Sequence, residues 1–310
     1  RQPHTTAQRT GMKPMKTTAI DKQTDSPMSL VTCSYRPDFA RCETLCASVD
    51  RYVGREHHHF IVVPDRDLPL FRPLQSHRRS IVAVQDILPA SYFQLPGLKK
   101  WWLDSGLWPV RGWMMQQLTK LSADQLSDSE DIVFLDSDVE FIRPFDRSRF
   151  SSNGSLRLHR KPGEGSAGVH LKWHHSSAAL LGLEPDYFGS DYVAALTTWR
   201  RSNLVALKSH IETQTGRPWQ NAIGRQLTVS EYTLYGVFVE HVMGLEKAGH
   251  FGCAEDLCHC LWFGEDTEQF LTELDYCRPP QAVLVQSNIG LEQHRVDALV
   301  GQIRSQLAAV

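Results

Sequence analysis

The chain has 310 residues, of which 41% are hydrophobic and 22% are charged, so it can bury a sizeable core. Its formal net charge is -2 and its lysine and arginine residues are scattered, which argues against a nucleic-acid partner. No apolar run approaches the roughly 20 residues that a membrane-spanning helix needs. Seven cysteines in a chain of this length indicate free thiols in a reducing compartment, so a cytoplasmic globular protein is expected.

The first 27 residues are polar and carry almost no large apolar side chains. They also lack the apolar centre of a signal peptide. Such a composition leaves too little apolar surface to bury. A disordered arm is therefore predicted over residues 1–27, and a folded body over residues 28–310.

Alternating strand and helix patterns open the folded body. A β-branched run predicts a strand at residues 28–35. Apolar residues at helical spacing predict a helix at residues 38–53, with Asp38 as its N-cap. Further strands are expected at residues 58–65 and 80–88. This alternation is typical of an α/β protein with a parallel sheet.

An amphipathic helix is expected at the end of the tryptophan-rich segment 90–126. Its apolar stripe contains Met114, Met115, Leu118 and Leu121, and a second face carries Trp113, Gln116, Gln117 and Lys120. Two interpretations of the second face are open. It is either the solvated side of the helix or a surface that meets a ligand.

Two aspartates follow a buried strand in the stretch IVFLDSDVEF, residues 132–141. A parallel strand delivers its C-terminal residues to the edge of the sheet where α/β proteins bind ligands. The spacing places Asp136 and Asp138 on one side of the chain and Ser137 on the other. Two such carboxylates repel each other unless a cation lies between them, and a divalent cation that carries phosphate oxygens meets that need. The alternative is a pair of solvated acids in a loop.

The second half of the sequence is less regular. The predicted segments are a Gly- and His-rich loop at 163–177, two helices at 190–216, a helix at 227–244, a strand at 281–290 and a closing helix at 291–310. The segment 253–263 fits a strand or a helix. No internal repeat and no low-complexity linker divides the chain, so a single body is expected.

Four segments, taken in order, carry a resemblance. VPDRDLPLF, GWMMQQLTKL, FLDSDVEFIRPF and SEYTLYG resemble segments of bacterial GT-A glycosyltransferases, which use nucleotide sugars, and the similarity covers about residues 28–290. The resemblance implies an α/β, Rossmann-like single domain with a mixed, mostly parallel sheet flanked by helices. It also implies a nucleotide-sugar-binding half at residues 28–145, and an acceptor half with the closing helix at residues 146–310.

The resemblance assigns roles to residues of the first half. Thr32, Ser34 and Tyr35 would flank the base and ribose, with Gln117, Asp136 and Ser137 as further donor-binding residues. Asp138 would bind Mn²⁺ or Mg²⁺ directly, and Asp136 would face the ribose or bind the metal through water. Lys120 would approach the donor and offset charge on the departing diphosphate.

In the second half, Glu231 would act as the base that deprotonates the acceptor, or would bind an acceptor sugar. The alternative is a carboxylate in the first turn of a helix that Ser230 caps. Tyr232, Tyr235 and His170 would bind the acceptor, and His259 would be a third metal ligand or a histidine satisfied within a strand. The residues His57, His58 and His59 are expected at the surface. The spacing of Cys253, Cys258 and Cys260 does not match a structural zinc site.

These expectations combine into a metal-dependent transfer of a sugar from a nucleotide diphosphate, with UDP-sugars favoured, to a glycan or glycolipid acceptor. Such an enzyme would serve bacterial surface-polysaccharide or glycolipid synthesis in the cytoplasm, with possible association at the inner face of the membrane. Two alternatives are a nucleotidyltransferase that makes the sugar nucleotide and a non-catalytic carbohydrate-binding protein. The first normally has a glycine-rich signature after its first strand, and TCSYRPDFARC lacks one.

Overall fold

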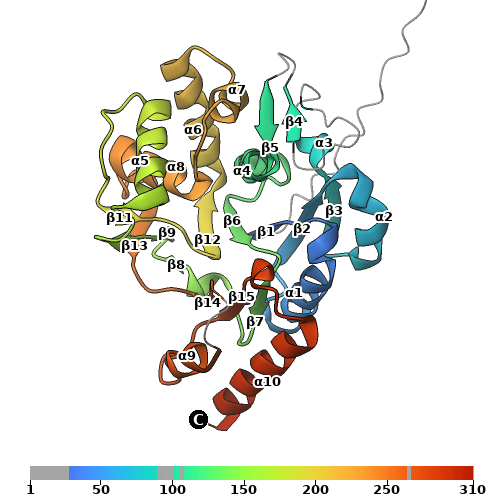
Figure 1. The fold of residues 1–310 in the computed structure, drawn as a ribbon. Helices are drawn as coiled ribbons and strands as arrows, with labels where there is room; N and C mark the ends of the chain where they lie inside the picture. Colours follow the sequence, from blue (N-terminus) through green and yellow to red (C-terminus); the bar gives the residue numbers. More distant parts are fainter. Residues whose placement is uncertain (1–27, 89–91, 93–100, 105–107, 264–266, 310) are drawn as a thin grey trace, which may run out of the picture.

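The structure is a computed structural model that describes residues 28–88, 92, 101–104, 108–263 and 267–309. The predicted arm over residues 1–27 lies outside the described residues. A five-stranded sheet forms the centre of the molecule, in the order β12-β6-β1-β2-β3 (Figure 1). Its strands are β1 (Met28–Cys33), β2 (His57–Val63), β3 (Arg79–Ala83), β6 (Asp131–Leu135) and β12 (Leu196–Arg200).

Four strands of this sheet run parallel, and β12 runs antiparallel to β6. The central strands β1 and β6 are buried along their whole length, so both of their faces are largely apolar. The predicted α/β class with a mostly parallel sheet flanked by helices is therefore confirmed.

The helices lie around this sheet (Figure 1). They are α1 (Phe39–Tyr52), α2 (Leu68–Phe71), α3 (Val84–Ile87), α4 (Gly112–Leu121), α5 (Gly168–Leu181), α6 (Arg201–Thr215), α7 (Trp219–Gly224), α8 (Glu231–Val237), α9 (Thr267–Thr272) and α10 (Gln293–Ala309). A π-helical turn at Phe238–Met243 extends α8.

Each face of the central sheet has its own apolar core. Val31 of β1 and Phe134 of β6 belong to a large cluster shared with α4, α6 and α8. Leu30 and Leu135 belong to a second cluster, shared with α1. Neighbouring residues of a strand point to opposite faces, so the same two strands contribute to both clusters. This double burial fixes where the carboxyl ends of β1 and β6 lie.

Smaller sheets flank the central one. They contain β4 (Trp101–Leu103) and β5 (Pro109–Arg111); β7 (Val139–Phe141), β14 (Cys258–Leu261) and β15 (Ala282–Val285); β8 (Ser151–Ser152), β9 (Ser155–His159) and β13 (His250–Cys253); and β10 (Lys161–Pro162) and β11 (Ser190–Asp191). Strand β15 pairs with β7, the strand that follows the two aspartates.

The order of the strands creates a crevice beside β1. From β1 the chain adds β2 and then β3 on one side, and it later places β6 on the other side. In such a sheet the connections after the two central strands leave in opposite directions, and ligands bind between the carboxyl ends of those strands. Here the crevice lies where β1 ends at Cys33 and β6 ends at Leu135.

Most elements predicted in the first half are confirmed. Strands β1 and β2 begin and end within a few residues of the predicted positions, and the helix predicted at 38–53 is α1. The strand predicted at 80–88 is shorter, because β3 ends at Ala83 and the next residues form α3. The predictions at 227–244, 281–290 and 291–310 are confirmed by α8 with its π-helical turn, β15 and α10.

Two predictions in the second half are wrong. The segment expected to be a loop at 163–177 contains the start of α5. Its buried face includes a polar residue, His174, which packs against Tyr187 and Phe188, so the apolar spacing of a helix is not visible in the sequence. The segment 190–216 contains one helix rather than two, since its first part forms β12. The β-branched and aromatic residues of LTTWR suit a strand, and the pairing of β12 with β6 stabilises it.

The prediction that His57, His58 and His59 lie at the surface is also wrong. All three are buried in β2. The imidazole Nε2 of His59 lies 3.0 Å from Thr32 Oγ1, and that of His58 lies 2.8 Å from Ser80 Oγ. Burial lowers the pKa of each of these histidines below its ordinary value of 6.5. The second strand therefore holds three neutral imidazoles.

These histidines predict acid-sensitive stability. Their pKa values are lowered in the folded state, so the stabilisation is complete above about pH 6.5 and is lost as the pH falls through and below that value. We expect the free energy of unfolding, measured in urea, to decline between pH 7.5 and pH 5. The variant His59→Gln, whose amide can replace Nε2 without titrating, should show a shallower decline. The exposed His294→Gln serves as the control, and equal slopes for wild type and His59→Gln would contradict the argument.

Candidate functional site

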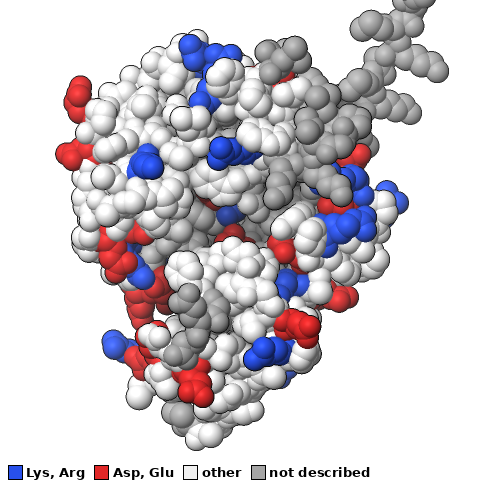
Figure 2. Space-filling view, in the orientation of Figure 1, with Lys and Arg blue, Asp and Glu red and all other residues white. Residues whose placement is uncertain are grey.

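The two aspartates stand at the crevice. Asp136 and Asp138 lie in the turn between β6 and β7, which the Val139 amide closes by donating to the Asp136 carbonyl at 3.2 Å. The Asp136 amide donates to the carbonyl of Ala195 at 3.4 Å. Figure 2 shows that this face of the molecule is hollowed near its centre, with acidic and basic side chains inside the hollow. The backbone thus fixes the turn that carries both carboxylates at the carboxyl end of β6.

A buried lysine meets the first aspartate. The Lys120 ammonium lies 3.1 Å from Asp136 Oδ1 and 3.0 Å from Glu231 Oε1, and it donates to the Tyr232 hydroxyl at 2.6 Å. We refer to these four residues as the Lys120 cluster. Burial alone would lower the pKa of Lys120, but the carboxylates of Asp136 and Glu231 together raise it well above its ordinary value. Lys120 is therefore charged throughout the physiological range.

The helix face that carries Lys120 is not solvated. Gln117 and Lys120 are both buried, so the interpretation as a wet surface is wrong for these two residues, whereas Trp113 on the same face is exposed. The side-chain oxygen Oε1 of Gln117 accepts a hydrogen bond from the backbone amide of Glu231 at 2.9 Å. This bond ties α4 to the first residue of α8, and it occupies the side-chain oxygen of Gln117 that was predicted to bind the donor.

The second aspartate lies among other acids. Asp138 Oδ2 accepts from the Ser287 amide at 2.9 Å. Burial, followed by the nearby Asp136 carboxylate, raises the pKa of Asp138 to about 7. Asp38 Oδ2 lies 3.4 Å from the Ser137 hydroxyl, and burial raises its pKa as well. In both carboxylates burial is the main cause of the raised pKa, and the neighbouring carboxylate of Asp136 adds to it.

Asp38 is a candidate site residue that sequence reasoning missed. It occupies the predicted N-cap position of α1, but its side chain makes no capping hydrogen bond. Its carboxylate instead faces Ser137 and Ser287. Asp38 follows shortly after the end of β1, the strand that borders the crevice, and this position could have indicated a site residue.

The balance of charge at this site favours a cation. Four carboxylates, Asp38, Asp136, Asp138 and Glu231, are accompanied by two cations, Lys120 and Arg41. When all four carboxylates are ionised, a state that a bound cation favours, the difference, four minus two, is two negative charges. Oxygen ligands with this excess suit a divalent ion such as Mg²⁺ or Mn²⁺. Asp136 and Asp138 each keep one carboxylate oxygen outside the hydrogen bonds described above, so both could bind it. Within the described ranges, no three His, Cys, Asp or Glu side chains already converge as a metal cluster.

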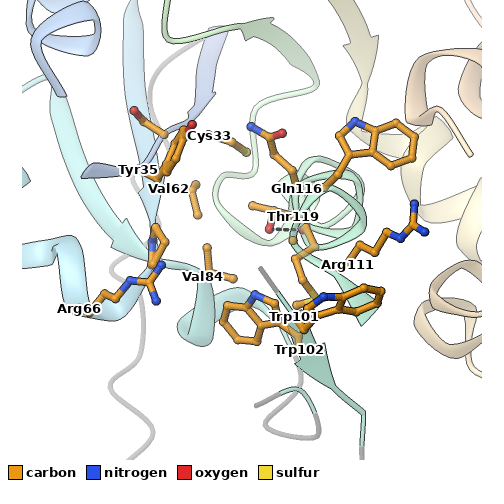
Figure 3. Close-up of a pocket in the computed structure, with 15 residues that line it drawn as sticks. Cys33, Tyr35, Val62, Arg66, Val84, Trp101, Trp102, Arg111, Gln116 and Thr119 are labelled. Atoms are coloured by element: carbon orange, nitrogen blue, oxygen red, sulfur yellow. Dashed lines mark hydrogen bonds between the residues drawn. The ribbon is translucent and has the colours of Figure 1, made fainter. Parts of the chain in front are cut away.

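A cavity of about 590 Å³ opens beside the carboxyl end of β1. Figure 3 shows Tyr35, Arg66, Trp101 and Trp102 around it, with Thr119 of α4 on the far wall. Ser34, for which a donor-binding role was predicted, also lines it. Its walls are mainly apolar and aromatic, which suits the flat faces of a planar ligand.

Tyr35 connects the cavity to the acids. Its side chain is half exposed and lines the cavity, and burial together with the carboxylates of Asp38 and Asp138 raises its pKa. Thr32, which was predicted to lie at the same place, is buried in the sheet and bonded to His59. A ligand in the cavity would therefore meet Ser34 and Tyr35 but not Thr32.

Three further predicted residues lie outside this group. The hydroxyl of Tyr235 accepts from the Arg200 amide at 2.9 Å, and its ring stacks on Trp199 in the core. His259 stacks on Phe270, whose carbonyl lies 2.8 Å from its Nε2. His170 on α5 pairs with Asp191 at 2.9 Å. The partners of these three residues do not include Asp136 or Asp138.

Part of the SEYTLYG segment has a packing role. A Cβ atom at Gly236 would lie 2.3 Å from the ring of Tyr192, so only glycine allows α8 to approach that ring. Ser230 caps the helix by accepting from the Thr233 amide at 3.4 Å. The segment therefore combines helix-forming and core residues with Glu231 and Tyr232 of the Lys120 cluster.

A family model described as a family of unknown function (DUF6492) matches residues 26–307. The match spans nearly all of the chain, so the chain belongs to this family. A search of curated proteins gives no match. All seven cysteines are free, as predicted, and no helix in the described ranges is long and apolar enough to cross a membrane.

The Lys120 cluster predicts a strong coupling between two substitutions. Lys120→Met should lower the free energy of unfolding by about 3–5 kcal/mol, because it leaves two carboxylates without their cation. Adding Glu231→Gln should restore at least about half of the loss, since one of those charges is removed. Urea unfolding of both single variants and the double variant measures this cycle. The exposed Lys172→Met on α5 is the control, and a double variant as unstable as the sum of its single variants would contradict the coupling.

Asp138 predicts a different dependence on pH. Its pKa is raised in the folded state from 3.8 to about 7. Between these values the unfolded chain loses the proton while the folded chain keeps it, so stability falls as the pH rises through this window. In EDTA, Asp138→Asn should gain in melting temperature over wild type by about 2 °C or more between pH 4 and pH 8. A constant difference, like that expected for the exposed Asp186→Asn, would contradict this.

Proposed function

We propose that the protein is a metal-dependent glycosyltransferase that moves a sugar from a nucleotide diphosphate to the hydroxyl of a glycan or glycolipid acceptor. In such a transfer the bond between the anomeric carbon and the diphosphate oxygen breaks. The acceptor oxygen forms the new bond and its proton is released. The observation that carries the proposal is that Tyr35, which lines the aromatic cavity, lies within electrostatic reach of Asp38 and Asp138 at the carboxyl ends of β1 and β6.

The cavity supports a nucleotide as the ligand. Its aromatic walls offer stacking faces for a base, and Arg66 and Arg111 among its lining residues attract phosphate. Tyr35 leads from the cavity toward Asp38 and Asp138. A nucleotide placed with its base in the cavity can therefore direct its diphosphate toward the two aspartates.

The acids support a bound Mn²⁺ or Mg²⁺, held by Asp136 and Asp138. Bound there, the ion would stabilise the negative charge of the leaving diphosphate. The Ser287 amide holds one oxygen of Asp138 and Lys120 holds one oxygen of Asp136, so each carboxylate has a second oxygen that could bind the ion. The excess of two negative charges over cations at the site agrees with a divalent ion.

Glu231 fits a positioning role better than the role of base. It is 2% exposed and lies against Lys120, so an acceptor hydroxyl has no direct access to it. Its charge keeps Lys120 protonated, and Lys120 orients Asp136. Tyr232 is likewise buried beneath the ammonium and does not offer an open face to a sugar.

The test is metal-dependent binding of UDP, measured by thermal shift and calorimetry. Wild type should bind UDP with Mn²⁺ at least about tenfold more tightly than in EDTA, a difference of 1.4 kcal/mol. Asp138→Asn should lose this advantage, whereas Glu43→Gln, an exposed carboxylate on α1, should keep it. Slow release of UDP from UDP-sugars with Mn²⁺ should follow the same pattern. Equal binding of UDP with and without metal would refute the proposal.

A further inference from the structure

A second cavity lies on another side of the aspartate turn. It has a volume of about 640 Å³, and its lining includes Ala194, Ala195, Cys258 and Trp262. The carbonyl of Ala195 accepts the hydrogen bond from the Asp136 amide at 3.4 Å. One residue that lines the cavity is therefore bonded directly to the aspartate turn.

Cys258 links the two places as well. Its thiol is buried, and burial is the main cause of its raised pKa, followed by the neighbouring Cys260. The carboxylates of Asp256 and Asp138 raise the pKa further. Asp256 lines the cavity and Asp138 belongs to the candidate site. The thiol thus lies within electrostatic reach of both, which agrees with the bond between Ala195 and the aspartate turn.

The lining of this cavity is polar and acidic. It carries four carboxylates and two cations: Glu255, Asp256, Glu273, Asp275, Lys161 and Arg278. Both cations are paired within the cavity, Lys161 with Asp256 at 2.7 Å and Arg278 with Asp275 at 3.3 Å. The charges of Glu255 and Glu273 are therefore left in excess. Figure 2 shows acidic side chains gathered at the lower left, around β13, β14 and α9.

Trp262 supplies the apolar element of the cavity. It is half-buried and packs against the cluster that contains Leu135, Val139 and Ala195. An aromatic face beside hydrogen-bonding carboxylates suits the alternating apolar and hydroxyl faces of a sugar ring. An anionic ligand would be repelled by the excess carboxylates.

We propose that this cavity binds the acceptor, and that it selects uncharged glycans over those with uronic acids. The inference rests on the proposed function, because it takes a sugar acceptor as the second substrate. It adds the location of the acceptor and the charge of its sugars. The acceptor would approach the donor from the side of Ala195, away from the aromatic cavity.

The probes are methyl glycosides of glucose, galactose and mannose, compared with the matching methyl glycuronides by saturation-transfer NMR. For at least one sugar, wild type should bind the neutral glycoside about tenfold or more tightly than its uronide, as expected for a charge placed near two carboxylates. The double variant Glu255→Lys with Glu273→Lys should reverse this preference. Both glutamates are exposed, so the fold should tolerate the change. Trp262→Ala should weaken binding of every glycoside.

The control carries the same change of charge elsewhere, as Glu184→Lys with Glu246→Lys at two exposed positions. It should retain the preference of wild type. Binding of UDP with Mn²⁺, measured on the same samples, reports the proposed function separately, and both double variants should keep it. Three results would each overturn the inference. They are the absence of glycoside binding, equal binding of neutral and acidic sugars, and a preference that the double variant Glu255→Lys with Glu273→Lys leaves unchanged.

Discussion

The arrangement of the site depends on one buried cation. Lys120 comes from α4, and its partners Asp136 and Glu231 come from the end of β6 and the start of α8. A buried ammonium is costly unless several acceptors satisfy it, and here two carboxylates and the Tyr232 hydroxyl do so. Because the three elements must meet at this point, the ammonium fixes how the second half of the chain packs on the first.

The same interaction explains why the acids do not simply repel each other. Lys120 offsets the charge of Asp136, and the backbone amide of Ser287 binds Asp138. The two aspartates are thus held by different groups on different elements. Each carboxylate therefore has a second oxygen outside these contacts. A rigid set of half-satisfied carboxylates is well suited to a ligand that brings positive charge of its own.

The sequence was most informative where local pattern and burial agree. The strand before Asp136 could be predicted because four apolar residues precede the acids, and α1 and α10 could be predicted from their apolar spacing. The same reasoning placed Asp136, Asp138 and Lys120 among the candidate residues. Each of them follows or faces an element whose position the pattern determines.

Long-range partners account for what could not be predicted. Whether Lys120 faces water depends on Glu231, which is far away in the sequence. The strand β12 is stabilised by its pairing with β6, and its own residues gave a weak signal. Asp38 looked like a helix cap because the serines that it meets, Ser137 and Ser287, belong to other elements. The core position of Tyr235 could not be foreseen for the same reason, since its partner Trp199 was not known, and the choice between the two interpretations of His259 depended on Phe270.

The pairing of β12 with β6 has a consequence for synthesis of the chain. Strand β6 ends at Leu135, but the strand that covers its open edge begins only at Leu196. At roughly 5–20 residues per second, a growing chain leaves this apolar edge uncovered for several seconds. An exposed edge of this kind invites pairing with other chains. Asp136 and Asp138 lie at the end of this edge, and both are charged in the growing chain before β12 is synthesised. They would therefore discourage association of nascent chains before the sheet is complete.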